Sequence, residues 1–392
     1  MIAMGRLKLA ADLPSERLLA AEFFAGIGLV RLGLDAAGFT VIWSNDVDPG
    51  KCEMYGGHFQ DKAHHRLVEG DIATVDGASL PDRLSLAWAS FPCIDLSLAG
   101  WRRGLDGLHS ATFWHFTRIL GEMGVRRPPV VALENVVGLA TSHGGADLAS
   151  AIRELNHLGY SVDVLTLDAR RFVPQSRPRL FLIGVQNPPT DESSQPNELR
   201  PTWLQTTFSE SSLTTHRATL PPPPPLLTSG LSSIVEPLPD SDERWWDEVR
   251  TASFLDSLSK LQAKRLDLLL NDDAVRHRTA YRRTRRRISV WEIRSDDVSG
   301  CLRTTRGGSS KQALVQAGRG KVRVRWMTPR EYARLMGAPD YMLAGVRNNQ
   351  LLFGFGDAVC VPVVRWLAEN YLRPHLTGWA SETIHQCTAA NA

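Results

Sequence analysis

The stretch that decides the fold is LLAAEFFAGIG, residues 18–28. A short apolar run leads into a turn with glycines at positions 26 and 28, and a segment with helical periodicity, LVRLGLDAAG, follows. Because glycine has no Cβ, such a turn lets a ligand approach the backbone and the amides at the start of a helix. A tight turn without a ligand needs the same residues. The third glycine of the dinucleotide fingerprint is missing, since residue 31 is Arg, which disfavours a nicotinamide oxidoreductase.

The same alternation continues to about residue 185. Helical segments such as ATFWHFTRILGEM alternate with strand-like apolar runs, namely TVIWSN, LSLAWAS, PVVALEN, SVDVLTL and LFLIGV. This pattern predicts an α/β fold with a mostly parallel sheet covered on both faces. Ligands of such sheets bind at the carboxyl ends of the strands. Residues just after each apolar run are therefore the candidates for function.

Composition sets broad limits. A chain of 392 residues has room for one large and one smaller domain. No run approaches the ~20 apolar residues of a membrane span, and the first residues lack the apolar core of a secretory signal. The cysteines are odd in number and show no zinc-ligand spacing, which favours free thiols in a reducing cytoplasm and predicts no metal site.

The composition changes after residue 185. Residues 187–243 are rich in Pro, Ser and Thr and include PPPPP at 221–225, which is typical of a loop or an extended linker. RHRTAYRRTRRR, residues 276–287, holds seven arginines. Such a run is a solvated face, a disordered basic arm or a phosphate-binding surface, and the net charge of +3 does not decide between them. From residue 328 a compact pattern returns, with a helix predicted over TPREYARLMG.

Acidic residues follow two of the earlier runs. Asp46 lies in NDVD after the second run, and Asp71 follows a further turn in GDI. Carboxylates at the ends of successive parallel strands can accept hydrogen bonds from ribose hydroxyls and from an adenine amino group. Each of them alone is typical of a turn or a helix cap. Together with the glycine turn, the ordered set indicates a nucleoside-containing cofactor.

Three further motifs carry reactive groups. FPCIDLS, residues 91–97, places a cysteine after a proline where a strand ends, as either an inert packing thiol or a nucleophile. LENV, residues 133–136, places a carboxylate at the end of an apolar run, where it could act as an acid. In QSRPR, residues 175–179, two arginines at spacing two point the same way from an extended chain. They could clamp an anion or a carbonyl, or lie at the surface.

The ordered set resembles the cytosine-5 DNA methyltransferases of bacteria. FFAGIG, NDVD and GDI resemble the family's three cofactor motifs, and FPCIDLS its Pro-Cys motif. LENV and QSRPR match the Glu-Asn-Val and Gln-x-Arg-x-Arg motifs, while RWMTPREYARLMGAPD and FGFGDAV resemble the last two. The resemblance covers about residues 18–185 and 320–371 in family order. It implies a Rossmann-like sheet that uses S-adenosylmethionine, with a second, smaller target-recognition domain.

The domain boundaries follow from the same resemblance. We predict a first part of the catalytic domain over residues 1–186 and a target-recognition domain with its linker over 187–325. Residues 326–375 are expected to return to the catalytic domain, and 376–392 to form a tail. The implied partner is double-stranded DNA, with a cognate restriction endonuclease or other defence proteins as further partners and no membrane. We expect a monomer in the bacterial cytoplasm, associated with the nucleoid.

The resemblance also implies roles for individual residues. Cys93 would be the nucleophile that adds to carbon 6 of a flipped-out cytosine, and Glu134 would engage N3 and the amino group. Arg179 would hold the base carbonyl, with Arg177 supporting it. The implied contacts to S-adenosylmethionine are Phe24, Ala25, Gly26, Gly28, Asp46, Val47, Asp71, Ile72, Pro92, Asp357, Ala358 and Val359. The implied contacts to DNA are Ile94, Ser97, Gln175, Arg282, Arg283, Arg285, Arg286, Thr304, Arg306, Gly307 and Ser309.

Three positions depart from the family pattern. The family usually has Gln after the catalytic Cys, Glu in its second motif and Asn in its last, where this chain has Ile94, Asp46 and Asp357. None of these changes removes the Cys, the Glu or the arginines. Two alternatives stay open, a methyltransferase acting on transfer RNA and a DNA-binding regulator with little turnover. The Cys-Phe-Thr motif of the RNA-directed relatives is absent, which favours DNA.

Overall fold

The computed structural model describes residues 17–60, 63–91, 111–189, 195–285, 288–304 and 311–377. The chain folds into two compact units. The first comprises Met1–Leu167, Pro178–Pro223 and Val363–Ala392, and the second comprises Asp168–Arg177 and Pro224–Pro362. These limits differ from the boundaries expected from the sequence, because residues 187–223 belong to the first unit and residues 326–362 to the second.

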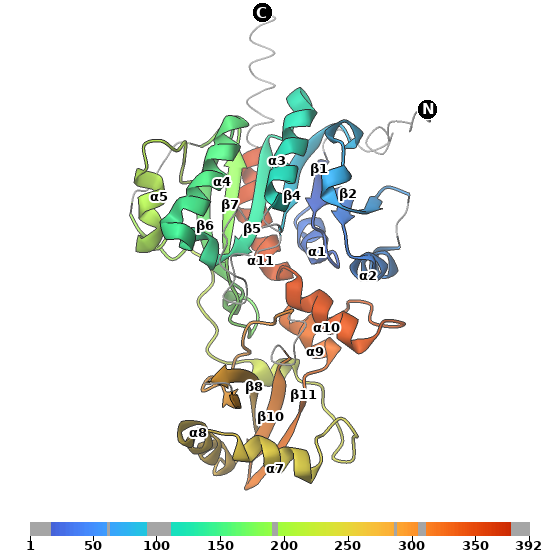
Figure 1. The fold of residues 1–392 in the computed structure, drawn as a ribbon, viewed down its shortest axis with the longest axis vertical. Helices are drawn as coiled ribbons and strands as arrows, with labels where there is room; N and C mark the ends of the chain where they lie inside the picture. Colours follow the sequence, from blue (N-terminus) through green and yellow to red (C-terminus); the bar gives the residue numbers. More distant parts are fainter. Residues whose placement is uncertain are drawn as a thin grey trace, which may run out of the picture. The chain divides into compact units, whose positions relative to one another are not determined.

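The first unit is built on a seven-stranded sheet with the strand order β3-β2-β1-β4-β5-β7-β6 (Figure 1). Its strands are β1 (Leu18–Phe23), β2 (Phe39–Asp46), β3 (Arg66–Glu69), β4 (Leu84–Ala89), β5 (Val130–Val136), β6 (Ser161–Asp168) and β7 (Pro178–Val185). Strands β1 to β5 pair in parallel, whereas β7 runs antiparallel to β5. The α/β fold class predicted from the sequence is confirmed.

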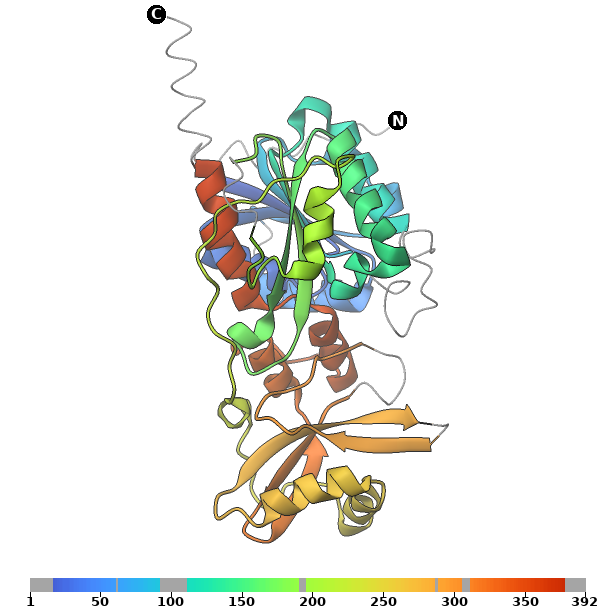
Figure 2. The ribbon, with the colours of Figure 1, turned by 90° about the vertical axis from the view of Figure 1, so that its left-hand side faces the viewer.

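Helices cover both faces of this sheet. Figure 2 shows the teal and green helices of residues 111–157 on one face and the red C-terminal helix on the other. The helices of the first unit are α1 (Leu29–Ala36), α2 (Pro49–Phe59), α3 (Ala111–Met123), α4 (Ala146–His157) and α5 (Gln205–Ser209). Helix α11 (Val361–Leu367) begins at the end of the second unit. The strands carry buried apolar side chains on both sides, as a doubly covered sheet requires.

The strand order places the candidate motifs at one edge of the sheet. From β1 the chain moves outward to β2 and β3, and it then crosses back to β4 on the other side of β1. Such a reversal creates a crevice at the carboxyl ends of the two central strands, where ligands of α/β sheets bind. Four motifs follow the carboxyl ends of β1, β2, β4 and β5.

The second unit contains a four-stranded antiparallel sheet with the order β11-β10-β8-β9. Its strands are β8 (Arg276–Arg285), β9 (Ile288–Ile293), β10 (Ala313–Gly318) and β11 (Lys321–Trp326). Its helices are α6 (Leu231–Ile234), α7 (Glu248–Asp256), α8 (Lys260–Leu270), α9 (Pro329–Leu335) and α10 (Asn348–Asp357). Helices α7 and α8 pack against one face of the sheet and bury Phe254 and Leu266 there (Figure 2). The arginine run is therefore an ordered strand over residues 276–285.

One helical stretch of the described residues has the length and apolar character of a membrane span. Asn348–Thr377 reaches a mean hydropathy of 1.6 over its most apolar window, and 61% of that window is buried in the fold. Polar residues such as Asp357, Arg365 and Glu369 interrupt it, so the sequence shows no continuous apolar run. Burial of this kind is typical of core helices in globular proteins.

Candidate active site

The turn after β1 has the backbone conformation that its glycines allow. Gly26 and Gly28 have φ values of +56° and +80°. A Cβ added to Gly28 would lie 2.4 Å from Cε2 of Phe59 and 2.7 Å from a ring atom of Tyr55, whereas a Cβ on Gly26 would meet nothing within 4 Å. Gly28 is thus required by packing against α2. Gly26 instead leaves open space beside the backbone, which fits the approach of a ligand.

Asp46 joins the first two motifs. Its Oδ2 accepts a hydrogen bond from the Gly26 amide at 2.7 Å, and its Oδ1 accepts one from the Asp48 amide at 2.9 Å. A carboxylate has about four acceptor positions, so both oxygens can still accept hydroxyl donors. The shorter side chain at this family position therefore holds the glycine turn and remains suited to a ribose.

The predicted adenine contacts differ in exposure. Val47 has 65% of its surface exposed, so its apolar side chain is accessible to a flat apolar ring. Asp71 is exposed, and its carboxylate accepts a hydrogen bond from the Ala73 amide at 2.9 Å. Ile72 is buried in the core, with 3% of its surface exposed. Asp71 is a helix cap as well as a candidate ligand contact.

A buried acid, Glu22, lies near the end of β1 and was not predicted as a site residue from the sequence. Glu22 is buried, and burial raises the pKa of its carboxyl well above the usual range, against a smaller opposing effect of the Arg31 guanidinium. Its Oε2 accepts a weak hydrogen bond from Ser44 Oγ at 3.5 Å. The signal in the sequence is an acid inside an otherwise apolar strand. Glu22 directly precedes the Phe23-Phe24 pair of the turn.

The entrance to the Pro-Cys motif is fixed by the Glu-Asn-Val motif. Buried Asn135 donates from Nδ2 to the backbone carbonyl of Phe91 at 3.3 Å. Phe91 is itself buried and directly precedes the motif's proline. The predicted residues Pro92, Cys93, Ile94 and Ser97 lie outside the described residues. This role of Asn135 was not predicted from the sequence.

Glu134 and Arg179 form an ion pair at the ends of β5 and β7. Arg179 Nε lies 2.8 Å from Glu134 Oε1, and the side chains are 15% and 9% exposed. In the antiparallel register Arg179 lies opposite Val136. Val136 is two residues after Glu134 on β5, so Glu134 and Arg179 point to the same face of the sheet and are diagonal neighbours. The structure therefore brings together a predicted acid and a predicted arginine from motifs that are distant in the sequence. A charge-assisted hydrogen bond of this length fixes the orientation of the carboxylate.

Arg177 has different partners. Its buried guanidinium donates to the backbone carbonyls of Leu302 at 2.9 Å, Gly356 at 3.1 Å and Ala358 at 2.7 Å, all within the second unit. The expectation that the two arginines point the same way as one clamp is not supported. Only Arg179 lies in β7, which begins at Pro178, so the alternation of an extended strand does not apply to Arg177.

Gln175 is also buried within the second unit. Its Nε2 donates to the Leu335 carbonyl at 2.8 Å, and its Oε1 accepts from the Leu302 amide at 3.1 Å. The expectation that Gln175 contacts DNA is not supported, because the side chain is fully buried and its amide is used inside the protein. Sequence alone does not distinguish a buried amide from an exposed one.

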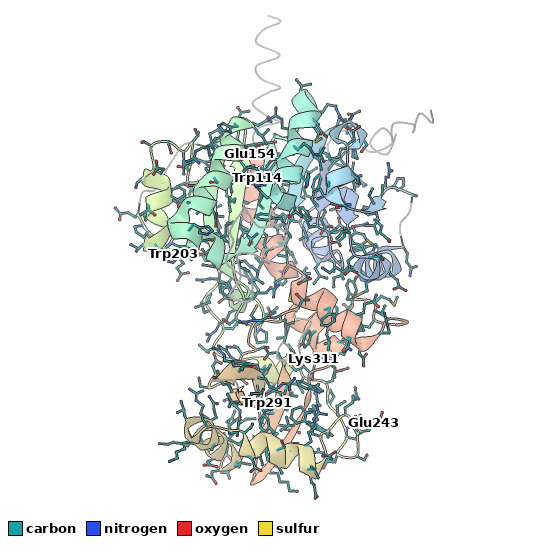
Figure 3. All side chains as sticks on the ribbon, viewed as in Figure 1. Trp114, Glu154, Trp203, Glu243, Trp291 and Lys311 are labelled. Atoms are coloured by element: carbon teal, nitrogen blue, oxygen red, sulfur yellow. The ribbon has the colours of Figure 1, made fainter. Side chains whose placement is uncertain are left out.

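The predicted DNA contacts of the arginine run lie on β8. The Arg282 guanidinium lies 5.8 Å from the ring of Trp291, which is labelled in Figure 3, and Arg283 pairs with Glu292 at 3.2 Å. Such contacts orient long cationic side chains. Arg285 ends the strand. Arg286, Arg306, Gly307 and Ser309 lie outside the described residues.

The last motif contacts the start of the glycine-serine segment. The Thr304 hydroxyl donates to the carboxylate of Asp357, which is exposed at the end of α10. Val359, two residues on, is buried. No group of His, Cys, Asp and Glu side chains suited to a metal ion occurs in the part of the chain that the structure describes.

Together, the sheet and its motifs have the arrangement of an α/β methyltransferase fold, and solved structures share this fold. The crystal structure of S. pombe Dnmt2 methyltransferase matches 90% of this chain and 98% of its own with a TM-score of 0.54 at 17% identity. The Entamoeba histolytica methyltransferase EhMeth matches 92% and 99% with a TM-score of 0.58 at 15% identity. At these identities the likeness concerns the fold alone.

The family is shown by the sequence. The model of the C-5 cytosine-specific DNA methylase family matches residues 19–373, so the chain belongs to that family. The type II methyltransferase M.NlaX of Neisseria lactamica is 29% identical over 89% of this chain and 94% of its own. M.HhaI of Haemophilus parahaemolyticus is 25% identical over 89% and 92%. The chain is therefore an enzyme of the DNA (cytosine-5-)-methyltransferase class.

Proposed function

We propose that this protein transfers a methyl group from S-adenosylmethionine to carbon 5 of a flipped-out cytosine in a specific sequence of duplex DNA. The observation that supports this most directly is the Glu134–Arg179 pair, 2.8 Å apart at the end of β5. The next residue, Asn135, anchors Phe91 at the entrance to the Pro-Cys motif. An acid and a base-binding arginine thus lie on the neighbouring strands β5 and β7, and the predicted nucleophile follows the next strand, β4, in the sequence.

The chemistry requires these groups because carbon 5 of cytosine is a poor nucleophile. In our proposal the Cys93 thiolate adds to carbon 6, and Glu134 stabilises the proton at N3 as the adduct forms. Arg179 keeps Glu134 oriented and donates to the base carbonyl. After methylation a base removes the proton from carbon 5, the carbon 5–carbon 6 double bond re-forms and the Cys93 thiolate leaves.

S-Adenosylmethionine supplies an electrophilic methyl group when it is bound. The open backbone at Gly26, the Asp46 carboxylate and the exposed Val47 fit its methionine, ribose and adenine parts, respectively. The remaining contacts proposed from the family resemblance are Phe24, Ala25, Gly28, Asp71, Ile72, Pro92, Asp357, Ala358 and Val359. Gly28 and Ile72 would contribute through their backbone, since Gly28 is required by packing and the Ile72 side chain is buried.

The DNA contacts are proposed on the second unit and on the Pro-Cys loop. The target atoms are stacked inside a duplex, so the nucleotide must be flipped out before reaction. Arg282 and Arg283 on β8 are suited to backbone phosphates, which give affinity without sequence information. Arg285, Arg286, Thr304, Arg306, Gly307 and Ser309 complete the proposed surface, with Ile94 and Ser97 in the loop. Arg177 and Gln175 are instead assigned to positioning within the second unit.

The test is expression in a host that lacks DNA methylation, followed by bisulfite sequencing of its genomic DNA. Protection of cytosine in one sequence context is expected with the wild type and not with Cys93→Ala. Cys387→Ala, in the predicted tail, serves as a matched cysteine control and should protect the same context. Absence of protection with the wild type would refute the proposal. Protection confined to transfer RNA would support the RNA-directed alternative.

We further propose a role in restriction–modification or phage defence in the bacterial cytoplasm. The similarity to type II methyltransferases supports this assignment. If it is correct, DNA from expressing cells should resist a restriction endonuclease that cuts the context found by bisulfite sequencing. Cleavage of fully methylated DNA at that context would contradict a protective role.

A further inference from the structure

Strands β8 and β9 extend beyond the second sheet as a two-stranded ribbon. Strand β10 pairs with β8 over residues 276–280, whereas β9 pairs with β8 over residues 280–285. Among the described strands, residues 281–284 and 289–292, here called the outer ribbon, therefore pair only with each other. Figure 2 shows the outer ribbon leaving the sheet as a hairpin. The major groove of DNA is wide enough to admit a two-stranded β-ribbon of this kind.

The outer ribbon has two different sides, because successive residues of a strand point to opposite faces. Ala280 packs in the core of the second unit, on the side of the sheet that α7 and α8 cover. Arg282 continues that side, and its guanidinium lies over the ring of Trp291. Tyr281 and Arg283 point to the other side. There, 54% of the Arg283 side chain is exposed, so a ligand can reach it.

Two neighbours on the same side hold Arg283. Its Nε lies 3.2 Å from Glu292 Oε2, and its Nη2 donates a weaker hydrogen bond to the Tyr281 hydroxyl at 3.4 Å. The Tyr281 hydroxyl in turn donates to Glu292 Oε2 at 3.0 Å. In the antiparallel register Glu292 lies opposite Tyr281 and diagonal to Arg283. The three side chains, here called the Arg283 triad, therefore orient one another.

The contacts within the Arg283 triad use one edge of the guanidinium. Nε and Nη2 lie along the same edge of this planar group, and they contact Glu292 and Tyr281, respectively. The edge formed by Nη1 and Nη2 has the fork geometry that binds O6 and N7 of guanine with two hydrogen bonds. An arginine that is oriented before binding loses less side-chain entropy when it makes such a pair. A phosphate contact requires only a positive charge, which a side chain without fixed orientation also supplies.

We propose that Arg283 reads the major-groove edge of a guanine in the recognition sequence, with Glu292 and Tyr281 as positioning residues. The inference rests on the proposed function. Arg283 would thus contribute sequence information, which a phosphate contact does not. Arg282, on the opposite side of the outer ribbon, keeps its proposed role at a phosphate. The recognition sequence is therefore expected to contain a guanine besides the partner of the target cytosine.

The experiment compares duplexes that differ at one base pair. Bisulfite sequencing first gives the context that the wild type methylates. Duplex oligonucleotides then carry either this context or a variant in which one G·C pair, other than the target pair, is replaced by A·T. The ratio of kcat/KM on the context to kcat/KM on the variant is the discrimination at that position. Arg283→Lys keeps the charge and loses the fork, so we expect discrimination to fall about tenfold at one guanine and to stay unchanged elsewhere.

Two further variants test the positioning residues. Glu292→Gln and Tyr281→Phe each weaken a contact that orients Arg283. Each should lower discrimination at the same guanine as Arg283→Lys does, but by less. Because every ratio compares two duplexes with one enzyme sample, a partial loss of folded protein cancels.

Control variants are available on the same strand. Arg276, at the start of β8, has 52% of its side chain exposed and pairs through Nε with Asp272 at 2.9 Å. Arg276→Lys is the matched control and should leave discrimination unchanged at every position. Arg282→Lys should change kcat/KM by the same factor on all duplexes, as expected for a phosphate contact.

Three results would overturn the inference. They are unchanged discrimination in Arg283→Lys, an equal loss on all duplexes in that variant, and an effect of Glu292→Gln at a different position. A wild-type context with no guanine other than the partner of the target cytosine would overturn it too. Failure of the proposed function is seen separately, as absence of DNA methylation by the wild type.

Discussion

Replacing Arg179 by Met tests the most specific feature of the site. The substitution keeps an unbranched side chain and removes the charge that faces Glu134 at 2.8 Å. Breaking a fully buried ion pair costs about 3–5 kcal/mol, and a hydrogen bond to a charged group contributes about 1.5–3 kcal/mol. Since 9% and 15% of the two side chains are exposed, solvent relieves part of this cost. We expect a loss of about 2 kcal/mol in the free energy of unfolding, within the range for such bonds.

The kinetic effect should exceed the effect on stability. A carboxylate that is no longer oriented costs about 100-fold in kcat, while Glu134→Gln removes the proposed acid and should cost about 1,000-fold. Because the two residues act as a unit, the double variant should be no slower than Glu134→Gln. The assay is transfer of labelled methyl groups to unmethylated bacteriophage DNA, alongside urea unfolding.

A matched control is available in the same unit. Arg365 and Glu369 form a pair through the same atoms at the same 2.8 Å, but with 56% and 39% of the side chains exposed. Arg365→Met should cost about 0.5 kcal/mol or less and leave kcat unchanged. Wild-type kcat in Arg179→Met, or a double variant whose loss equals the product of the single losses, would refute the assigned role of the pair.

Three other substitutions have distinct expected outcomes. Glu22→Gln should stabilise the protein more at pH 8 than at pH 5. As the pH rises past the ordinary carboxyl range, only the unfolded wild type releases the Glu22 proton, so the free energy of unfolding of the wild type falls. Equal shifts of Tm at both pH values would contradict this. Gly28→Ala should lower the free energy of unfolding in urea by about 3 kcal/mol, because of the clash with Phe59 and the positive φ. Gly26→Ala should lower it by about 1 kcal/mol and should mainly weaken S-adenosylhomocysteine binding. Similar effects of both substitutions would show that Gly26 does not face the cofactor. Asn135→Leu should lower kcat without changing DNA affinity, because it releases the Phe91 carbonyl at the entrance to the nucleophile's loop; an unchanged kcat would exclude that role.

The parts of the fold that follow from local pattern were predictable. The alternation of apolar runs with helical segments predicted the doubly covered sheet. The position of Asp46 after the apolar run TVIWSN predicted the end of β2. The antiparallel direction of β7 was not predictable, because it depends on pairing with a strand more than forty residues earlier. The contact of Arg179 with Glu134 follows from that pairing and could be expected only from the family resemblance.

Two site residues have surroundings that the sequence did not predict. Gln175 and Arg177 were expected near a ligand from the family resemblance, yet both are buried, where backbone carbonyls and amides of distant segments need partners. The structure of the arginine run, residues 276–287, was not predicted from the sequence, because a high charge does not exclude a strand. Ala280 in its middle is fully buried and opposite Ile293, which anchors the run in the second sheet.

The reversed direction of β7 also bears on how this chain can change during evolution. After β5 the chain passes through α4 to the edge strand β6, and it then returns to β7, which lies between β5 and β6. A change of length in the connection from β5 to β6, residues 137–160, does not alter the pairing of β5 with β7 and leaves the Glu134–Arg179 distance as it is. A slip of β7 by one residue would turn Arg179 to the opposite face of the sheet. Variation in length is therefore tolerated in that connection where variation in the register of β7 is not, and lineages can diversify the connection without losing the reaction.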